Sequence, residues 1–469
     1  MKTRCVIFLL VCASAAAPAL SPAQKSGSVQ VWLTNADKSA LFEAQKPLLR
    51  FSPAKSEEPT IEIDDQKTFQ TVDGFGFALT GGSAQHLAHM DARKRASLLK
   101  ELFAVDAGNI GISYLRISIG SSDLNDHVFS YDDLPGGGTD PQLAKFSLAP
   151  DGQDLIPVLK EILAINPGIQ LLGSPWSPPA WMKTNNNPKG GRLRTEDYAV
   201  YANYFLKYLQ EMRAEGITVG AITIQNEPLN DKNTPSMLMS AEEQALFLKD
   251  DLGPAFKVAG MHTKIILYDH NCDVPEYALS ILSDAQANPF ADGSGFHLYG
   301  GDISAMSGVH NAFPLKNLYF TEFMAVEPTE SGRISIVKPV VGTFIGALGN
   351  WSRNVLLWNL AANSKFEPHT DNGGCPICQG AVTIDGDTVT RNLAYYAMAH
   401  FSKFVRPASV RIASSSPATL PNVAFKAPDG KIVLIAANDG NSALDFRVRY
   451  RGKSFRTTLK KGAVATYVW

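Results

Sequence analysis

Ile222-Thr-Ile-Gln-Asn-Glu-Pro228 is a run of β-branched residues that stops on an amide, a carboxylate and a proline. It predicts a buried β-strand with polar residues at its carboxyl end, because Pro228 ends the strand and restricts the backbone of Glu227. A second run, Leu318-Tyr-Phe-Thr-Glu-Phe323, also ends on a single acid, Glu322. Burying an isolated carboxylate costs several kcal/mol, so each acid needs either hydrogen-bonding partners, as in a structural Asn–Glu pair, or a function.

Runs of this kind alternate with helical patterns along most of the chain. The expected strands are Gly74–Ala78, Ser113–Ile119, Gln170–Ser174, Ala221–Gln225, Lys264–Tyr268, Ser294–His297, Asn317–Thr321 and Asn354–Trp358. The expected helices between or after them include Glu196–Glu215, Glu242–Leu252, Val337–Ala347 and Tyr395–Phe404. Eight strands alternating with helices predict an α/β fold of the (β/α)8 TIM-barrel type. A doubly wound sheet has the same alternation, so the residues at the strand ends must decide between the two.

The last part of the chain has a different sequence pattern, without helical periodicity. Six short strand-like runs follow residue 404, separated by turns such as Asp429-Gly430 and Lys461-Gly462, which is typical of an all-β sandwich. We expect the sandwich to take further strands from the N-terminal segment, and therefore to be built from both chain ends. The expected divisions are a signal peptide at 1–23, sandwich strands within 24–70, the catalytic barrel at 71–404 and the C-terminal sandwich at 405–469.

The composition is that of an ordinary globular protein. The chain has 469 residues, of which 45% are apolar and 19% charged, with a formal net charge of −2. This balance gives no reason to expect nucleic acid as a partner. At the N-terminus, Lys2 and Arg4 precede the apolar run from Cys5 to Ala17, which is the pattern of an export signal and too short to span a bilayer. We therefore expect a secreted or periplasmic protein with no transmembrane segment.

Three cysteines remain after such a signal is removed. Cys375-Pro-Ile-Cys378 has the spacing of a redox motif or of half a zinc site, but there is no second pair to complete a four-cysteine site. Flanking glycines indicate a loop rather than the start of a helix. In an oxidising compartment, a structural disulfide between Cys375 and Cys378 is the interpretation we favour, with Cys272 unpaired.

The two acids suit the chemistry of glycosidic bonds. One carboxyl group protonates the leaving oxygen while the other attacks the anomeric carbon, and in retaining enzymes the two lie about 5–5.5 Å apart. Indoles are expected nearby, since the proline-rich loop after the third strand carries Trp176 and the eighth strand ends at Trp358. Aromatic faces on loops suit the C–H-rich faces of glucose. By contrast, the tyrosines at 201, 204 and 208 follow helical spacing and are expected in the core.

Other catalytic signatures are absent. The chain has no Gly-x-Ser-x-Gly elbow, no phosphate-binding loop and no His-Glu-x-x-His, and Gly74-Phe-Gly76 lacks the third glycine of a dinucleotide fingerprint. His86 and His89 share a helical face without further ligands and are expected to form a surface pair. We therefore expect neither a cofactor nor a metal.

At these residues the chain resembles glycoside hydrolase family 30, the glucosylceramidase-like enzymes that pair a (β/α)8 barrel with a β-sandwich. The resemblance extends from about Phe69 to the C-terminus. Its motifs are Asp73–Thr80, Leu115–Asp123, Gly173–Thr184, Gln225–Pro228, His297–Tyr299, Thr321-Glu322, Trp358–Ala361 and His400–Phe404. It implies that Glu227 is the acid/base and Glu322 the nucleophile.

The resemblance also implies roles for the residues around the acids. Asn226 would bond the sugar 2-hydroxyl, and Asp123, Trp176 and Trp358 would hold the glucose ring. Arg116 and Tyr299 would orient the nucleophile, and His297 would line the pocket. One departure concerns the first strand, where human-type lysosomal enzymes have Thr-Asp and this chain has Thr80-Gly81.

The substrate expected is a β-glucan or β-glucoside. The loop from Pro368 to Cys378 resembles the bacterial and fungal β-1,6-glucanase branch more than the lysosomal enzymes, so β-1,6-glucan is the leading substrate. Glucosylceramide or a simple β-glucoside is the alternative. Xylanase branches of the family and a family-5-like cellulase are less favoured. A non-catalytic carbohydrate-binding barrel is also less favoured, because a binding protein needs aromatic residues but no second carboxylate.

Overall fold

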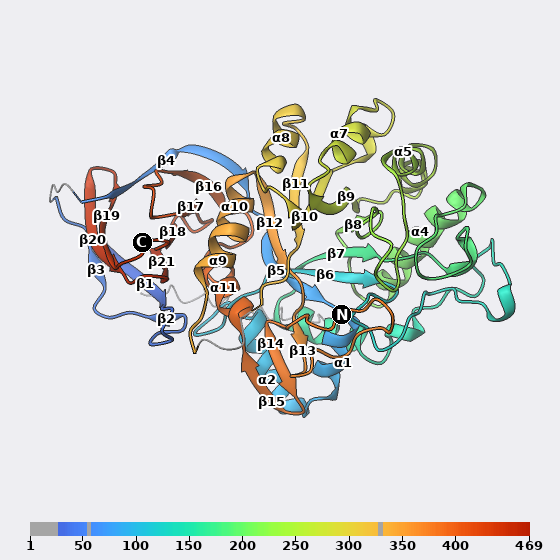
Figure 1. Ribbon diagram of the computed structural model, residues 1–469, viewed down its shortest axis with the longest axis horizontal. Coiled ribbons are helices and arrows are strands. Elements are labelled where there is room, and N and C mark those ends of the chain that lie inside the picture. Colours follow the sequence, from blue (N-terminus) through green and yellow to red (C-terminus); the bar gives the residue numbers. More distant parts are fainter. Residues whose placement is uncertain (1–26, 54–57, 327–331) are drawn as a thin grey trace, which may run out of the picture.

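The computed structural model describes residues 27–53, 58–326 and 332–469, and the signal peptide expected at 1–23 lies outside these ranges. Eight parallel strands close into a barrel in the order β5-β6-β7-β8-β9-β10-β11-β12, at the centre of Figure 1. They are β5 Gly74–Leu79, β6 Tyr114–Ile119, β7 Gln170–Pro175, β8 Ala221–Thr223, β9 Lys264–Cys272, β10 Gly293–Gly301, β11 Asn317–Glu322 and β12 Ser352–Leu357. The predicted TIM barrel is confirmed, and each expected strand overlaps an observed one.

Helices surround the barrel and shield its outer face. They are α1 Gly81–His89, α2 Ala92–Phe103, α3 Leu155–Ile165, α4 Tyr198–Ala214, α5 Ala241–Leu246, α6 Gly253–Val258, α7 Glu276–Ser283, α8 Ala305–Ala312, α9 Val337–Pro339, α10 Gly346–Gly349 and α11 Leu393–Ser402. π-helical turns at Phe247–Leu252 and Val340–Ile345 join α5 to α6 and α9 to α10. The tyrosines expected in the core are buried on α4 as predicted: Tyr201, Tyr204 and Tyr208. No described helix is long and apolar enough to cross a membrane.

The β-sandwich lies beside the barrel, at the left of Figure 1, and is built from both chain ends as predicted. Its strands are β1 Ser28–Thr34, β2 Glu43–Ala44, β3 Leu49–Arg50, β4 Thr60–Thr71, β16 Val410–Ser414, β17 Asn422–Lys426, β18 Ile432–Ala437, β19 Leu444–Tyr450, β20 Lys453–Leu459 and β21 Val464–Val468. From the N-terminal part, β1 pairs with β21, and β4 lies between β16 and β19.

A buried histidine joins the two units. His400 on α11 contacts Thr466 on β21 and Thr34 on β1, each through one ring nitrogen at 2.9 Å. After the last barrel strand, a small sheet of β13 Ala361–Ala362, β14 Val382–Asp385 and β15 Thr388–Arg391 packs near α1. Because all eight barrel strands are parallel, their carboxyl ends meet at one mouth, where the residues predicted for the site converge.

Candidate active site

Glu227 and Glu322 lie close together at the barrel mouth. Glu322 is the last residue of β11, and Glu227 follows β8, whose regular strand ends at Thr223 rather than at the expected Gln225. They are only 7% and 6% exposed. One carboxylate oxygen of each, together with a ring nitrogen of His297, lies within 4.8 Å of the others. This spacing is near that of retaining glycosidases and too short for the water that inverting enzymes place between their acids.

Arg116, on β6, is the cation that holds Glu322 in place. Its fully buried guanidinium donates from Nη1 to Glu322 Oε2 at 2.6 Å, and from Nη2 to Asn226 Oδ1 at 2.6 Å. The second interaction occupies the carbonyl oxygen of Asn226, so the amide presents its NH2 group as the hydrogen-bond donor. Arg116 also lies over the Trp176 ring, 4.8 Å from the centroid.

Asp269 belongs to the same cluster, although no motif in the sequence marked it as a site residue. Its buried carboxylate accepts hydrogen bonds from Arg116 at 2.8 Å, Thr223 at 2.7 Å and Thr321 at 2.6 Å. Burial opposes its charge, but Arg116, His297 and Thr321 hold the pKa of Asp269 well below its usual range. The available signal was a polar residue directly after the expected strand Lys264–Tyr268, the same pattern that marked Glu227.

His297, on β10, lies between three carboxylates. Its Nδ1 is 3.2 Å from Glu227 Oε1 and 3.9 Å from Glu322 Oε1, and its Nε2 is 3.0 Å from Asp269 Oδ1. Burial disfavours the charged imidazolium, but the negative charges of Glu322, Asp269 and Glu227 outweigh burial and raise the pKa of His297 to about 9. His297 therefore holds a proton within reach of Glu227.

Glu227 is held from both sides. Asn230 donates to Glu227 Oε2 at 2.7 Å, and His297 faces Oε1. Although burial raises the pKa of Glu227, the neighbouring imidazolium lowers it to about 2, so the proton shared by this pair rests on His297. The backbone of Glu227 has a φ of 45°, whereas a residue before proline usually adopts an extended conformation. Its amide bonds the Asp269 carbonyl, which stabilises this strained arrangement.

Glu322 has a second donor in Tyr299, whose hydroxyl lies 3.0 Å from Oε1. Tyr299 is 44% exposed overall, but its hydroxyl reaches inward. Burial of that hydroxyl and the negative charges of Glu322 and Glu227 raise the pKa of Tyr299 well above 10, so the hydroxyl remains a donor. Burial also raises the pKa of Glu322, and His297 and Arg116 counteract this effect.

Two indoles and an acid form the wall beside the carboxylates. Trp176 and Trp358 lie with ring centroids 5.4 Å apart, and Trp176 is 2% exposed. The indole N–H of Trp176 is buried and has no hydrogen-bond partner among the described residues. Asp123 is buried nearby, and burial, Glu322 and Glu227 together raise its pKa to about 8. An unpaired donor beside a neutral carboxyl group can bind the adjacent hydroxyls of a sugar.

The loop between β13 and β14 packs against this wall. Cys375 and Cys378 form a disulfide, and both pack with Trp176 and Trp358. Thr370 in the same loop donates its backbone N–H to the Asp123 carbonyl at 2.9 Å. Cys272 is buried and bonds to no described cysteine.

Gly81, which stands where human-type lysosomal enzymes have an aspartate, has a structural reason. A Cβ atom at Gly81 would lie 1.9 Å from the side-chain amide of Asn125, so this amide occupies the space into which a larger residue would project.

The cluster of Glu227, His297 and Glu322 also has the spacing of a metal site, since each offers one ligand atom. Arg116 already places a positive charge on Glu322, and it opposes the binding of a second cation there.

Comparisons with known proteins agree with this architecture. Residues 72–405 match the TIM-barrel domain of glycosyl hydrolase family 30, and residues 409–467 match the β-sandwich domain of the same family. An endo-1,6-β-D-glucanase of Neurospora crassa is 34% identical over 89% of both chains. The lysosomal acid glucosylceramidase of Mus musculus is 28% identical over 87% of this chain and 83% of its own. A solved endo-β1,6-glucanase superposes with a TM-score of 0.87 at 32% identity, over 94% of this chain and 99% of that one.

Proposed function

The chain belongs to glycosyl hydrolase family 30, and from this premise we propose that it is a retaining β-glucanase that cleaves β-1,6-linked glucan. The observation that carries the mechanism is the pair of buried carboxylates, Glu227 and Glu322, with oxygens within 4.8 Å of each other. This spacing supports direct attack by one of them on the anomeric carbon and the formation of a covalent glucosyl-enzyme.

In the proposed first step, Glu322 attacks the anomeric carbon while Glu227 protonates the leaving oxygen. Arg116 and Tyr299 each donate to one oxygen of Glu322, which supports an ionised and fixed nucleophile. The Asn226 amide group donates to the sugar 2-hydroxyl, and Asp123 and Trp176 bind hydroxyls farther from the cleaved bond. In the second step Glu227 takes a proton from water, which attacks the anomeric carbon and releases Glu322.

His297 supplies the proton that Glu227 transfers. Glu322 is the largest electrostatic cause of the raised pKa of His297. When Glu322 becomes an ester, it loses its charge, and the pKa of His297 falls. The proton then moves over the 3.2 Å contact to Glu227, which delivers it to the leaving oxygen. Nucleophilic attack and proton donation are thus coupled through one imidazole.

The choice of β-1,6-glucan is supported by relatives that are endo-1,6-β-glucanases at 34% and 33% identity, and by the solved endo-β1,6-glucanase at 32%. Glucosylceramide is the second candidate, since glucosylceramidases of 28–31% identity are also related. We also propose that residues 1–23 direct export, on the basis of their composition. The domain divisions at residues 70 and 404 remain our proposals.

Two measurements test the proposed function. The wild-type protein, incubated with β-1,6-glucan, laminarin and glucosylceramide, should release products from the first, with the β-configuration retained at the moment of cleavage. If products are released only from glucosylceramide, glucosylceramide replaces β-1,6-glucan as the proposed substrate. A product of inverted configuration would overturn the mechanism. Glu322→Ala and Glu227→Ala should each fold normally and lose most activity, and azide should rescue Glu322→Ala with an inverted product. Two active variants would refute the roles assigned to these acids.

A further inference from the structure

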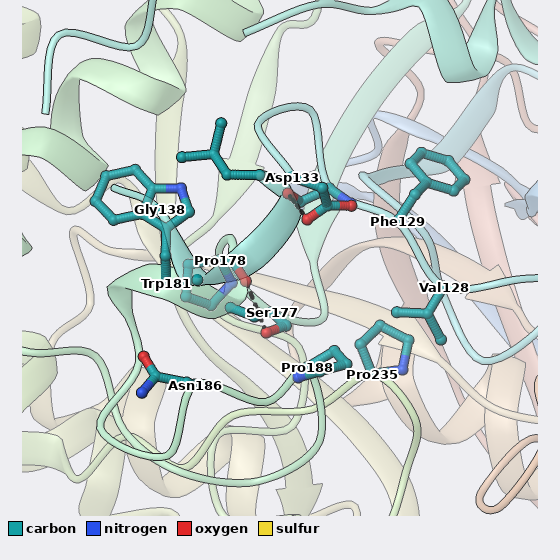
Figure 2. Close-up of a pocket in the computed structure, with 14 residues that line it drawn as sticks. Val128, Phe129, Asp133, Gly138, Ser177, Pro178, Trp181, Asn186, Pro188 and Pro235 are labelled. Carbon is teal, nitrogen blue, oxygen red and sulfur yellow. Dashed lines mark hydrogen bonds between the residues drawn. The ribbon is translucent and has the colours of Figure 1, made fainter. Parts of the chain in front are cut away.

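A cavity is lined in part by the residues that directly follow Trp176 of the proposed glucose site. We call it the outer pocket; its volume is about 350 Å³, and the lining residues used below are Phe129, Asp133, Gly138, Ser177, Trp181 and Pro235. Figure 2 shows Trp181 and Phe129 on opposite sides of the view, with Ser177 between them and Pro235 below Phe129. The volume is at the lower end of the range for small-molecule sites.

The outer pocket and the glucose site share a wall. Trp176 packs against Trp358 in the glucose site, while the next residue, Ser177, lines the outer pocket. The loop after β6 also contributes to both sites, since Asp123 lies near Glu227 and Glu322 and Phe129 lines the outer pocket. Gln225, just before the proposed catalytic residues, fixes this wall by donating to the Trp176 carbonyl at 2.7 Å.

The surface of the outer pocket combines aromatic and polar groups. The Trp181 indole is only 6% exposed and is fixed by a hydrogen bond to the Asp132 carbonyl at 3.0 Å, while Phe129 opposite is half-buried and presents the more accessible ring. Asp133 and Asn186 are exposed at its edge. Aromatic faces with polar groups around them suit a sugar ring, which has apolar C–H faces and a rim of hydroxyls.

A buried ammonium group holds the outer pocket in shape. Lys183 is fully buried, and its Nζ donates to Ser177 Oγ at 2.9 Å, the Pro188 carbonyl at 2.9 Å and the Ser236 carbonyl at 2.7 Å. Ser177 and Pro188 line the pocket, and Ser236 follows Pro235. One side chain therefore ties together three segments of the pocket, which gives a preformed rather than a collapsed cavity.

We propose that the outer pocket binds a glucosyl residue of the glucan chain other than the one cleaved. This inference rests on the proposed function, because it takes the glucan as the ligand. The pocket then favours a polymer over a small glucoside, since only the polymer can fill both sites at once.

Gly138 allows the pocket to be blocked without disturbing the backbone. It is exposed, its φ of −65° suits any residue, and an added Cβ would lie 3.8 Å from the nearest atoms of Leu134, which is ordinary contact. Gly138→Trp should fill the pocket, and Gly138→Ala is the matched control. The rate constant kcat/KM is measured for each on β-1,6-glucan and on an aryl β-glucoside, which occupies only the cleavage site.

We expect Gly138→Trp to lower kcat/KM on the glucan by about tenfold or more and to leave the aryl glucoside within about twofold of wild type. Gly138→Ala should match wild type on both substrates. If wild-type protein cleaves the glucan and Gly138→Trp cleaves it equally well, or loses both substrates equally, the second subsite is refuted while the proposed function stands. If wild-type protein does not cleave the glucan, the proposed substrate fails, and the subsite fails with it.

Discussion

Replacing Tyr299 by phenylalanine tests how the structure keeps Glu322 ionised. The change removes one hydroxyl, 3.0 Å from Glu322 Oε1, and leaves the Arg116 contact to Oε2 in place. A hydrogen bond to a charged group contributes about 1.5–3 kcal/mol, and one pKa unit corresponds to about 1.4 kcal/mol. Because Arg116 continues to stabilise the ionised form of Glu322, we take the lower end of this range. The pKa of Glu322 should therefore rise by about one unit.

The direction of this change in the pKa of Glu322 follows from which form of the carboxyl group the Tyr299 hydroxyl stabilises. It donates to the ionised carboxylate, so its loss favours the protonated form of Glu322, which cannot act as the proposed nucleophile, and the acid limb of the pH profile moves to higher pH. Below that limb, kcat/KM on an aryl β-glucoside should fall by about tenfold at a given pH. The assay is the pH dependence of kcat/KM for wild type and Tyr299→Phe. A matched control is Tyr450→Phe, whose hydroxyl contacts Asp65 in the β-sandwich. An acid limb that stays in place, or one that moves equally in the control, would refute this reasoning.

Two further pH effects follow from buried histidines. His297→Gln removes the imidazolium that has a pKa of about 9, so the alkaline limb of kcat/KM should move to lower pH; a limb that stays near pH 9 would contradict the role of His297 as the proton store. Burial lowers the pKa of His400 from 6.5 to about 3, so between these values only the unfolded chain binds this proton, and the free energy of unfolding falls on acidification by up to about 1.4 kcal/mol per pH unit. Urea unfolding at pH 4.5 and pH 7 should show a smaller loss for His400→Gln than for wild type, and equal losses would disprove this origin.

Much of the fold could be predicted because apolar strands and amphipathic helices have different periods. The strands of the barrel end where apolar runs meet polar residues, and this pattern alone predicts that Glu227 and Glu322 share one mouth of the barrel. The N-terminal contribution to the sandwich was predicted only in outline, since the register of β1 and β4 depends on partners more than 300 residues away.

The details of the site depend on contacts that no local pattern contains. No local pattern in the sequence distinguishes Lys183 from a surface lysine, but three segments of the chain fold around it and bury its side chain. Asp269 follows Tyr268, and both have positive φ values, 62° and 68°, so β9 has a bulge where the extended strand was expected to end, and it continues to Cys272. The Asp269 carboxylate at this bulge contacts Arg116 and His297, and only the closed barrel brings those two residues to it.

The charges in this cluster explain why Asp269 matters for the proposed reaction. Arg116 and Asp269 form a buried ion pair whose two charges cancel at every stage. Before attack, Glu322 carries the one remaining negative charge, because Glu227 and protonated His297 neutralise each other. After attack, Glu322 is an ester, and the negative charge lies on Glu227 beside a neutral His297. The net charge of the cluster is the same in both states, and the charge moves only between groups that His297 already contacts, at 3.2 Å and 3.9 Å. A buried site with fixed partners can accommodate such a short transfer with little reorganisation, which is the condition for electrostatic stabilisation of the transition state.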